Sequence, residues 1–248
     1  MKTTLFFVFF FISFFTSFVE GHAEPKTVLF IGNSYTAGSA HFIKEVFKRE
    51  STGYKLVFLN PGGKDLKHHL ASQQTRRLIE SRKWEHIVLQ GQSQKSGLGG
   101  KHTKEFHDAV VGLCKLARKQ GSRPCLYMTW GRRNGDKQNP DVYPDFLTMQ
   151  KKISSQYSQA ARANDADVVP VGHAFAHLHA TDKSIFASLY NNDGSHPAPP
   201  GGYLAACVFF GKITDKSPVD ITWNANLNPV VAATLRKTAV KVLGGDAF

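Results

Sequence analysis

Two short polar segments of this sequence could together form a nucleophilic centre. Residues 32–36 read Gly-Asn-Ser-Tyr-Thr and follow an apolar run, so Ser34 would stand where a strand turns into a helix. A serine hydroxyl at such a turn can attack a carbonyl, and nearby backbone N–H groups at a helix N-terminus can stabilise the resulting oxyanion. Taken alone, this segment is better explained by an ordinary serine at a helix cap.

The second segment, residues 193–197, reads Asp-Gly-Ser-His-Pro and precedes the last apolar helical stretches. Asp193 stands three residues before His196, and one turn of that length can bring the carboxylate to Nδ1 of the imidazole. Nε2 is then free to act as a general base. An isolated pattern of this kind would favour a surface turn, but together with Ser34 it predicts a triad of Ser34, His196 and Asp193.

Other candidates for chemistry are weaker. His173, His177 and His179 have a spacing that could place two rings on one helix face, but no neighbouring cysteines or carboxylates complete a metal site. The sequence therefore predicts no metal and no cofactor, and a helix face near the cleft is the better interpretation. His68 and His69 either line a pocket or are exposed.

Trp130 is followed by Gly131, Arg132 and Arg133. An aromatic ring beside arginines suits a sugar that bears acidic groups, so Trp130 and Arg132 are candidate substrate contacts. A tryptophan in the core with surface arginines beside it explains the same residues equally well. Asn33, next to Ser34, is a third candidate for substrate contact.

These segments must be positioned by alternating strands and helices. Short apolar runs predict strands at residues 27–31, 54–59, 87–89, 125–130 and 167–171. Longer amphipathic stretches predict helices from the first loop to about residue 50, then at 67–82, 104–119, 143–163, 201–213 and 228–243. Strands separated by helices pair in parallel through right-handed crossovers. The pattern thus predicts a three-layer α/β/α sandwich, flavodoxin-like, around a mostly parallel five-stranded sheet, with chemistry at the carboxyl ends of the strands.

Four motifs in this order resemble those of the SGNH/GDSL hydrolase superfamily. They are VLFIGNSYTAG at the start, NPGG after the second strand, LQGQSQ after the third, and DGSHP before the final helices. They extend from residue 27 to about residue 214 with the intervening elements. The chain is most similar to a secreted, esterase-like branch with GNS in place of GDS and a glutamine-rich third motif.

The resemblance implies a role for each matching position. Ser34 matches the nucleophile, and its own backbone N–H the first oxyanion donor. His196 matches the general base, and Asp193 the residue that orients it. The glycine after the second strand matches the second donor; of Gly62 and Gly63 we favour Gly63, because the family's turn runs on into a polar residue and a helix.

The third motif departs from the family pattern. Most members place an asparagine there, whose side-chain amide completes the oxyanion hole, whereas this chain has glutamines at positions 90, 92 and 94. A glutamine amide offers the same N–H donor on one more methylene group. We favour Gln92, with Gln90 and Gln94 as alternatives.

Composition sets the cellular context. Eight of the nineteen phenylalanines precede residue 20, where Lys2 and a largely apolar run up to Val19 predict a secretory signal peptide in residues 1–23. Residues 24–248 are then one hydrolase-like domain, exported without a stable membrane anchor. The net charge of +12 is scattered without an aromatic-interleaved stripe, which argues against nucleic acid and suits an acidic extracellular partner. Cys114 and Cys125 could pair, but the sequence does not decide it, nor does it decide the oligomeric state.

The resulting hypothesis is a secreted serine hydrolase of the carboxylesterase or acetylesterase type. Its substrate would be an acyl ester on an acidic or acetylated polysaccharide, from which it removes the O-acyl group, with acetyl favoured. The alternatives are a lipase or small acyl-ester hydrolase, and a non-catalytic protein that binds anionic glycan on the same fold.

Overall fold

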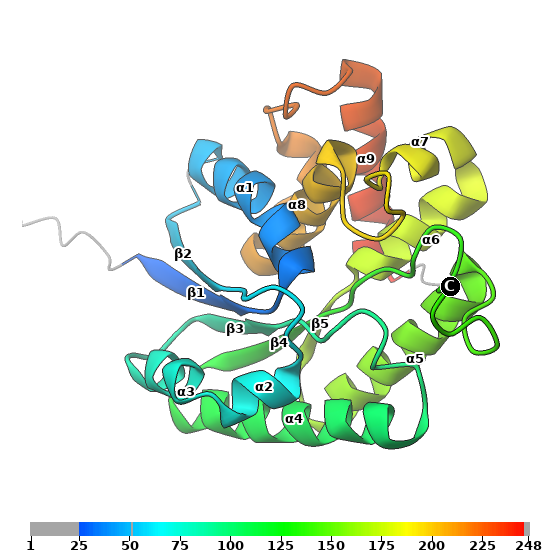
Figure 1. Cartoon of the computed structure of the whole chain (residues 1–248). Coiled ribbons are helices and arrows are strands. Elements are labelled where there is room, and N and C mark those ends of the chain that lie inside the picture. Colours follow the sequence, from blue (N-terminus) through cyan, green and yellow to red (C-terminus); the bar gives the residue numbers. More distant parts are fainter. Residues whose placement is uncertain (1–24, 51, 246–248) are drawn as a thin grey trace, which may run out of the picture.

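Five parallel strands form the centre of the molecule (Figure 1). The computed structural model describes residues 25–50 and 52–245, so the predicted signal peptide lies outside the described residues. The strands follow the order β2-β1-β3-β4-β5 across the sheet, and every neighbouring pair is parallel. Their bounds are β1 Lys26–Ile31, β2 Tyr54–Leu59, β3 His86–Leu89, β4 Arg123–Tyr127 and β5 Asp167–Val169. The predicted five-stranded α/β sandwich is confirmed, and the sheet is parallel throughout.

Helices cover both faces of the sheet, as Figure 1 shows. One layer contains α2 Leu66–Ala71, α3 Gln73–Glu80, α4 Gly100–Lys119 and α5 Phe146–Ala163. The other contains α1 Ser34–Arg49, α6 Val171–Thr181, α7 Lys183–Ser188, α8 Pro199–Thr214 and α9 Pro229–Leu243. Successive side chains of β1 alternate between the two cores: Val28 and Phe30 join one, Leu29 and Ile31 the other. The helices thereby bury the apolar residues on both sides of the sheet.

Helix α8 is apolar around nearly its whole circumference because it packs between α1 and α9. Its first residues follow the Asp193–His196 turn, so the buried helix fixes where that turn leaves the core. The turn itself is anchored at both ends: the N–H of Ala198 donates to the carbonyl of Leu189 at 2.9 Å, and the N–H of Asn191 donates to the carbonyl of His196 at 2.9 Å.

Several element boundaries differ from those predicted; among them, the fourth strand is Arg123–Tyr127 and not 125–130, and α5 begins at Phe146 and not at 143. The helix expected at 67–82 is two helices, because Ser72 adopts extended backbone (ψ 121°) and its side chain accepts from the N–H of Thr75 to cap α3. The last strand stops at Val169 because Pro170 has no N–H with which to continue the ladder. Helix α4 begins at Gly100, four residues before the predicted start.

The three cysteines are free and buried, so Cys114 and Cys125 do not form a disulfide. None of the helices in residues 25–50 and 52–245 combines the length and the hydropathy that a membrane span requires.

Candidate active site

The fold brings Ser34, His196 and Asp193 together at the carboxyl edge of the sheet. Ser34 is the first residue of α1, three residues after β1 ends, and the other two lie in the loop between α7 and α8. His196 Nε2 is 2.9 Å from Ser34 Oγ, and His196 Nδ1 is 2.5 Å from Asp193 Oδ2. Residues 162 positions apart in the sequence thus form the hydrogen-bonded chain that a serine nucleophile requires.

Hydrogen bonds within the loop hold Asp193 in place. Its Oδ1 accepts from the N–H groups of Ser195 and His196, both at 2.9 Å. Burial raises the pKa of Asp193, but the hydrogen bonds from the His196 ring and from these two backbone groups outweigh it, so the pKa lies below its usual value. An ionised carboxylate only accepts hydrogen bonds, so His196 Nδ1 carries the proton. Nε2 is then the acceptor for the Ser34 hydroxyl.

Asn33 holds the start of α1 and is not a substrate contact. Its Oδ1 accepts from the N–H of Tyr35 at 3.1 Å, which caps the helix, and its Nδ2 donates to the carbonyl of Lys64 at 2.8 Å. The residue is 3% exposed. The predicted substrate contact is therefore wrong: the side chain joins the nucleophile turn to the loop after β2.

The side chains of Gln90 and His69 hold the turn at residues 32–36 through further hydrogen bonds. Gln90 Oε1 accepts from the N–H of Asn33 and from the hydroxyl of Thr36, both at 2.9 Å, while its Nε2 donates to the carbonyl of Gly91. His69 Nε2 is 2.8 Å from the carbonyl oxygen of Gly32. Both side chains are buried, at 0% and 1% exposed.

Trp130 belongs to the core, so the prediction that it contacts substrate is wrong as well. It is 0% exposed and lies between the rings of Tyr35 and Phe175, with centroids 4.9 and 4.4 Å away and nearly parallel planes. Its Nε1 donates to the carbonyl of Ser195 at 3.0 Å. The ring thereby supports the turn that contains Asp193 and His196.

Tyr35 connects the two halves of the site. Its hydroxyl is 2.6 Å from Ser195 Oγ, and its ring packs edge-on against the His196 ring, with centroids 5.4 Å apart. Burial raises the pKa of Tyr35, so the hydroxyl remains protonated near neutral pH. Tyr35, which follows Ser34, therefore positions the turn that contains His196.

The glutamines of the third motif differ in what their amides bind. Gln90 is enclosed and its amide nitrogen is engaged with Gly91. Both hydrogens of the Gln94 amide have acceptors, because Nε2 donates to Asp136 Oδ2 at 2.6 Å and to Gln138 Oε1 at 2.8 Å. Gln92 is half-buried, and its Nε2 donates to Gln94 Oε1 at 2.8 Å, which leaves a second amide hydrogen available.

The loop after β2 supplies the remaining predicted donor. Gly63 is exposed and has a φ of +68°, a left-handed conformation that favours glycine. The contact of Asn33 with Lys64 holds this loop against the nucleophile turn. The roles of Gly63 and Gln92 as oxyanion donors stay predictions.

Arg132 is half-buried and turned toward a neighbouring carboxylate. Its Nη1 is 2.5 Å from Oδ1 of Asp136, which is itself 1% exposed, and about a quarter of the arginine side chain, 23%, remains exposed. Its contact with substrate stays a prediction.

Sequence reasoning did not assign the positioning roles of Tyr35, His69 and Gln90. His69 lies three residues after the buried Leu66, so it falls on the inner face of α2, and that periodicity is the signal that marks it as a buried polar residue. The chain of hydrogen bonds from Gln90 has no comparable signal, since its partners come from another strand end.

Solved structures share this arrangement of strands and helices. A protein of the DUF4886 family from Bacteroides uniformis aligns with a TM-score of 0.74 and 19% identity, over 89% of this chain and 95% of that one. A putative SGNH hydrolase from Slackia heliotrinireducens aligns with a TM-score of 0.62 and 24% identity, over 75% and 97%. The chain has the SGNH hydrolase fold.

An acetyl xylan esterase, AlAXEase, also aligns, with a TM-score of 0.58 and 14% identity over 75% of this chain and 98% of that one. No protein-family model matches the sequence, and no curated protein matches it. At these identities the likeness shows the SGNH hydrolase fold, and the chemistry must be argued from the site itself.

Proposed function

We propose that this protein is a serine esterase that hydrolyses a short O-acyl ester through an acyl-enzyme. The observation that carries the proposal is the continuous chain from Asp193 through His196 to Ser34, at 2.5 and 2.9 Å. Each atom is in the state the reaction needs, since Asp193 is ionised, Nδ1 is protonated and Nε2 can accept a proton.

In the first half of the reaction, His196 Nε2 takes the Ser34 proton while Oγ bonds to the ester carbonyl carbon. The tetrahedral intermediate collapses when the bond to the alkoxide breaks and His196 returns the proton to that oxygen. Water then attacks the acyl-serine with His196 as base, and the carboxylic acid leaves as Ser34 is regenerated. The N–H groups of Ser34 and Gly63 and the free amide hydrogen of Gln92 are the proposed donors to the oxyanion.

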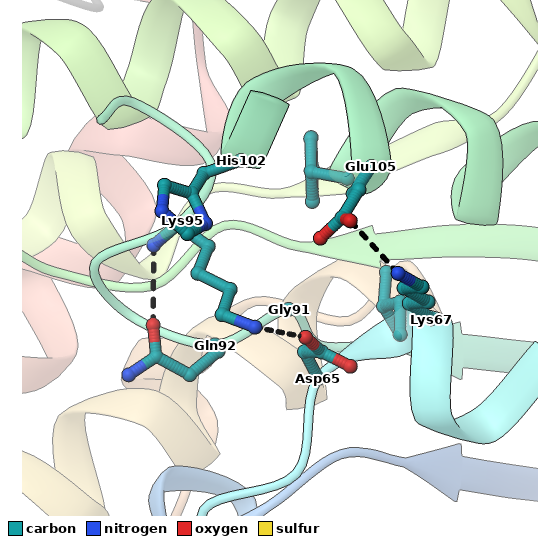
Figure 2. Close-up of a pocket in the computed structure, with 9 residues that line it drawn as sticks. Asp65, Lys67, Gly91, Gln92, Lys95, His102 and Glu105 are labelled. Atoms are coloured by element: carbon teal, nitrogen blue, oxygen red, sulfur yellow. Dashed lines mark hydrogen bonds and ion pairs between the residues drawn. The ribbon is translucent and has the colours of Figure 1, made fainter. Parts of the chain in front are cut away.

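A small pocket lies beside Gln92, and Ser34, Gly63 and His196 are not among its lining residues. Figure 2 shows Asp65 and Lys95 pointing toward one another in this pocket, with Glu105 and Lys67 paired nearby. The pocket has a volume of about 10 Å³, room for one water-sized group. A pocket of this size cannot hold a long acyl chain, so the Gln92 side of the proposed site suits a short one.

We further propose that the protein is exported and that its substrate is an acylated polysaccharide. The basis for export is the charged start and apolar run of residues 1–23. The net charge of +12 and a triad open to solvent, with Asp193 and His196 side chains 47% and 41% exposed, support a large extracellular substrate that reaches the serine from outside.

Replacement of Ser34 by alanine tests the assignment. We expect turnover of p-nitrophenyl acetate to fall by about 10⁴-fold or more and labelling by a fluorophosphonate probe to vanish, with unchanged thermal unfolding. Wild-type protein that takes no label would refute the esterase, as would a folded variant that retains full activity. A comparison of acetyl with long-chain esters tests the acyl preference, and faster turnover of the long chains would favour the lipase alternative.

A further inference from the structure

A basic groove between α4 and α5 lies outside the triad and its supporting residues. Its volume is about 960 Å³, and Lys104, Lys151, Lys152 and His107 line it together with the side-chain amides of Gln156 and Gln159. Two threonines, a serine and three glycines complete the lining, which includes no carboxylate and no Phe, Tyr or Trp. We propose that this groove binds an anionic polysaccharide chain and extends the substrate site of the esterase; this inference rests on the proposed function.

The charge of the groove is not cancelled locally. Lys151 and Lys152 are exposed and have no ion-pair partner among the described residues, whereas Lys104 is paired with Asp108 at 2.6 Å. Helix α5 has three Lys or Arg residues and no acidic residue along its length, and α4 has five against two. The groove therefore attracts an anion through cations whose charge remains available.

The shape of the groove indicates a chain-like ligand. Its lining on α5 runs from Thr148 to Gln159, which corresponds to about 16 Å along the helix axis. Hydroxyl and amide groups between the lysines are suitable hydrogen-bonding partners for sugar hydroxyls. Single-stranded nucleic acid relies on aromatic side chains for base stacking, and the lining offers none apart from the His107 ring.

The position of the groove relates it to the triad. Helices α4 and α5 follow β3 and β4, so both begin at the carboxyl edge of the sheet, where Ser34 lies. The groove includes the first turns of both helices, where the backbone adds partial positive charge. An anionic chain in the groove would thus be held at the edge that contains the nucleophile.

The loop that contains Gln92 also borders the groove, which Gly97 and Gly99 of this loop line. Gly97 packs so tightly on α5 that an added Cβ would lie 2.9 Å from Lys152 Cβ, and the hydroxyl of Tyr143 donates to the carbonyl of Gln94 at 2.5 Å. The loop thus packs on the Cβ of Lys152, an atom that glutamate also has. A polymer bound in the groove would lie beside this loop.

The test uses the full mature chain with Lys151→Glu and Lys152→Glu combined. For O-acetylated polygalacturonate at low ionic strength we expect KM to rise by about tenfold or more with kcat unchanged, because two charges change sign and the net charge of the groove falls by four units. Turnover of p-nitrophenyl acetate should not change. The matched control is Lys48→Glu with Lys237→Glu, which alters net charge equally on exposed positions of α1 and α9 in the opposite layer.

Binding of unacetylated polygalacturonate to the Ser34→Ala variant, measured by affinity electrophoresis, separates this inference from the esterase assignment. Retained binding that the α5 double variant abolishes supports the groove even if no ester is hydrolysed. Equal losses in the control pair, unchanged binding in the α5 pair, or tighter binding of single-stranded DNA than of polygalacturonate would each overturn it.

Discussion

Replacement of His69 by leucine is expected to destabilise the protein and slow ester hydrolysis, although His69 lies behind the nucleophile. A carbonyl oxygen only accepts, so His69 Nε2 donates to Gly32 at 2.8 Å, and Nδ1 accepts from the Thr75 hydroxyl at 3.2 Å. Leucine would leave both partners buried and unpaired. At about 1–3 kcal/mol for each, the free energy of unfolding should fall by about 2–6 kcal/mol.

Glutamine at position 69 is the matched control because its Nε2 can keep the bond to Gly32. Denaturant titrations at pH 7.5 should show His69→Gln losing less than half as much stability as His69→Leu. Since Gly32 is two residues before Ser34, kcat for p-nitrophenyl acetate should fall by about tenfold or more in the leucine variant. Equal stability and equal kcat in the two variants would refute the positioning role.

The same histidine predicts a pH dependence of stability. Desolvation lowers the pKa of His69 more than the hydrogen bond to Gly32 raises it. The unfolded chain therefore binds a proton that the folded protein does not, so stability falls as pH drops through the ordinary histidine pKa of about 6.5 toward the lowered folded value. Between pH 7.5 and 5.5 the wild type should lose more stability than His69→Gln; parallel curves would contradict this.

Three further changes have defined outcomes. Asp193→Asn should lower kcat on the order of 1000-fold without unfolding the protein, because the half-exposed side chain orients His196; a rate within tenfold of wild type would argue against the triad. Gly32→Ala should lower Tm by about 4–10 °C, since the new Cβ would stand 2.2 Å from Thr36 Oγ1 and 2.6 Å from Gln90 Oε1, and an unchanged Tm would show that the turn can relax. Burial raises the thiol pKa to about 11 for Cys114 and to about 12 for Cys125 and Cys207. A thiol reagent at pH 8 should therefore label none of the three before denaturation and all three afterwards. Rapid labelling of the folded protein would contradict their burial.

The local sequence determined the helices and strands wherever a residue pattern is compatible with only one of the two. The apolar run at β2 matches the observed strand, Tyr54–Leu59, and the alternation of strands with helices required a parallel sheet. The boundaries that were wrong depend on a single side chain or on a neighbour. Ser72 caps α3 and divides the predicted helix, and nothing in hydrophobic periodicity distinguishes that serine from a helical one.

The Asp193–His196 turn is similarly local, because the carboxylate reaches the ring three residues on and bonds the intervening backbone. The sequence therefore determined this half of the proposed triad, as well as Ser34 at a strand end. Their meeting across 162 residues depends on the sheet, which places β1 so that α1 begins beside the loop before α8.

Only the tertiary structure decided which polar and aromatic side chains face the solvent. Trp130 and Asn33 lie next to the candidate loops in the sequence, yet both side chains are buried. The indole of Trp130 is enclosed by Tyr35 and Phe175, and the Asn33 amide donates to the carbonyl of Lys64. The choice among the glutamines has the same origin. Gln90 and Gln92 have the same side chain, but the hydrogen-bond partners of Gln90 make it a support of the Asn33 turn, whereas those of Gln92 leave it a candidate oxyanion donor. Residue type and spacing define what a side chain can do, whereas long-range packing determines which of its polar atoms remain free to do it.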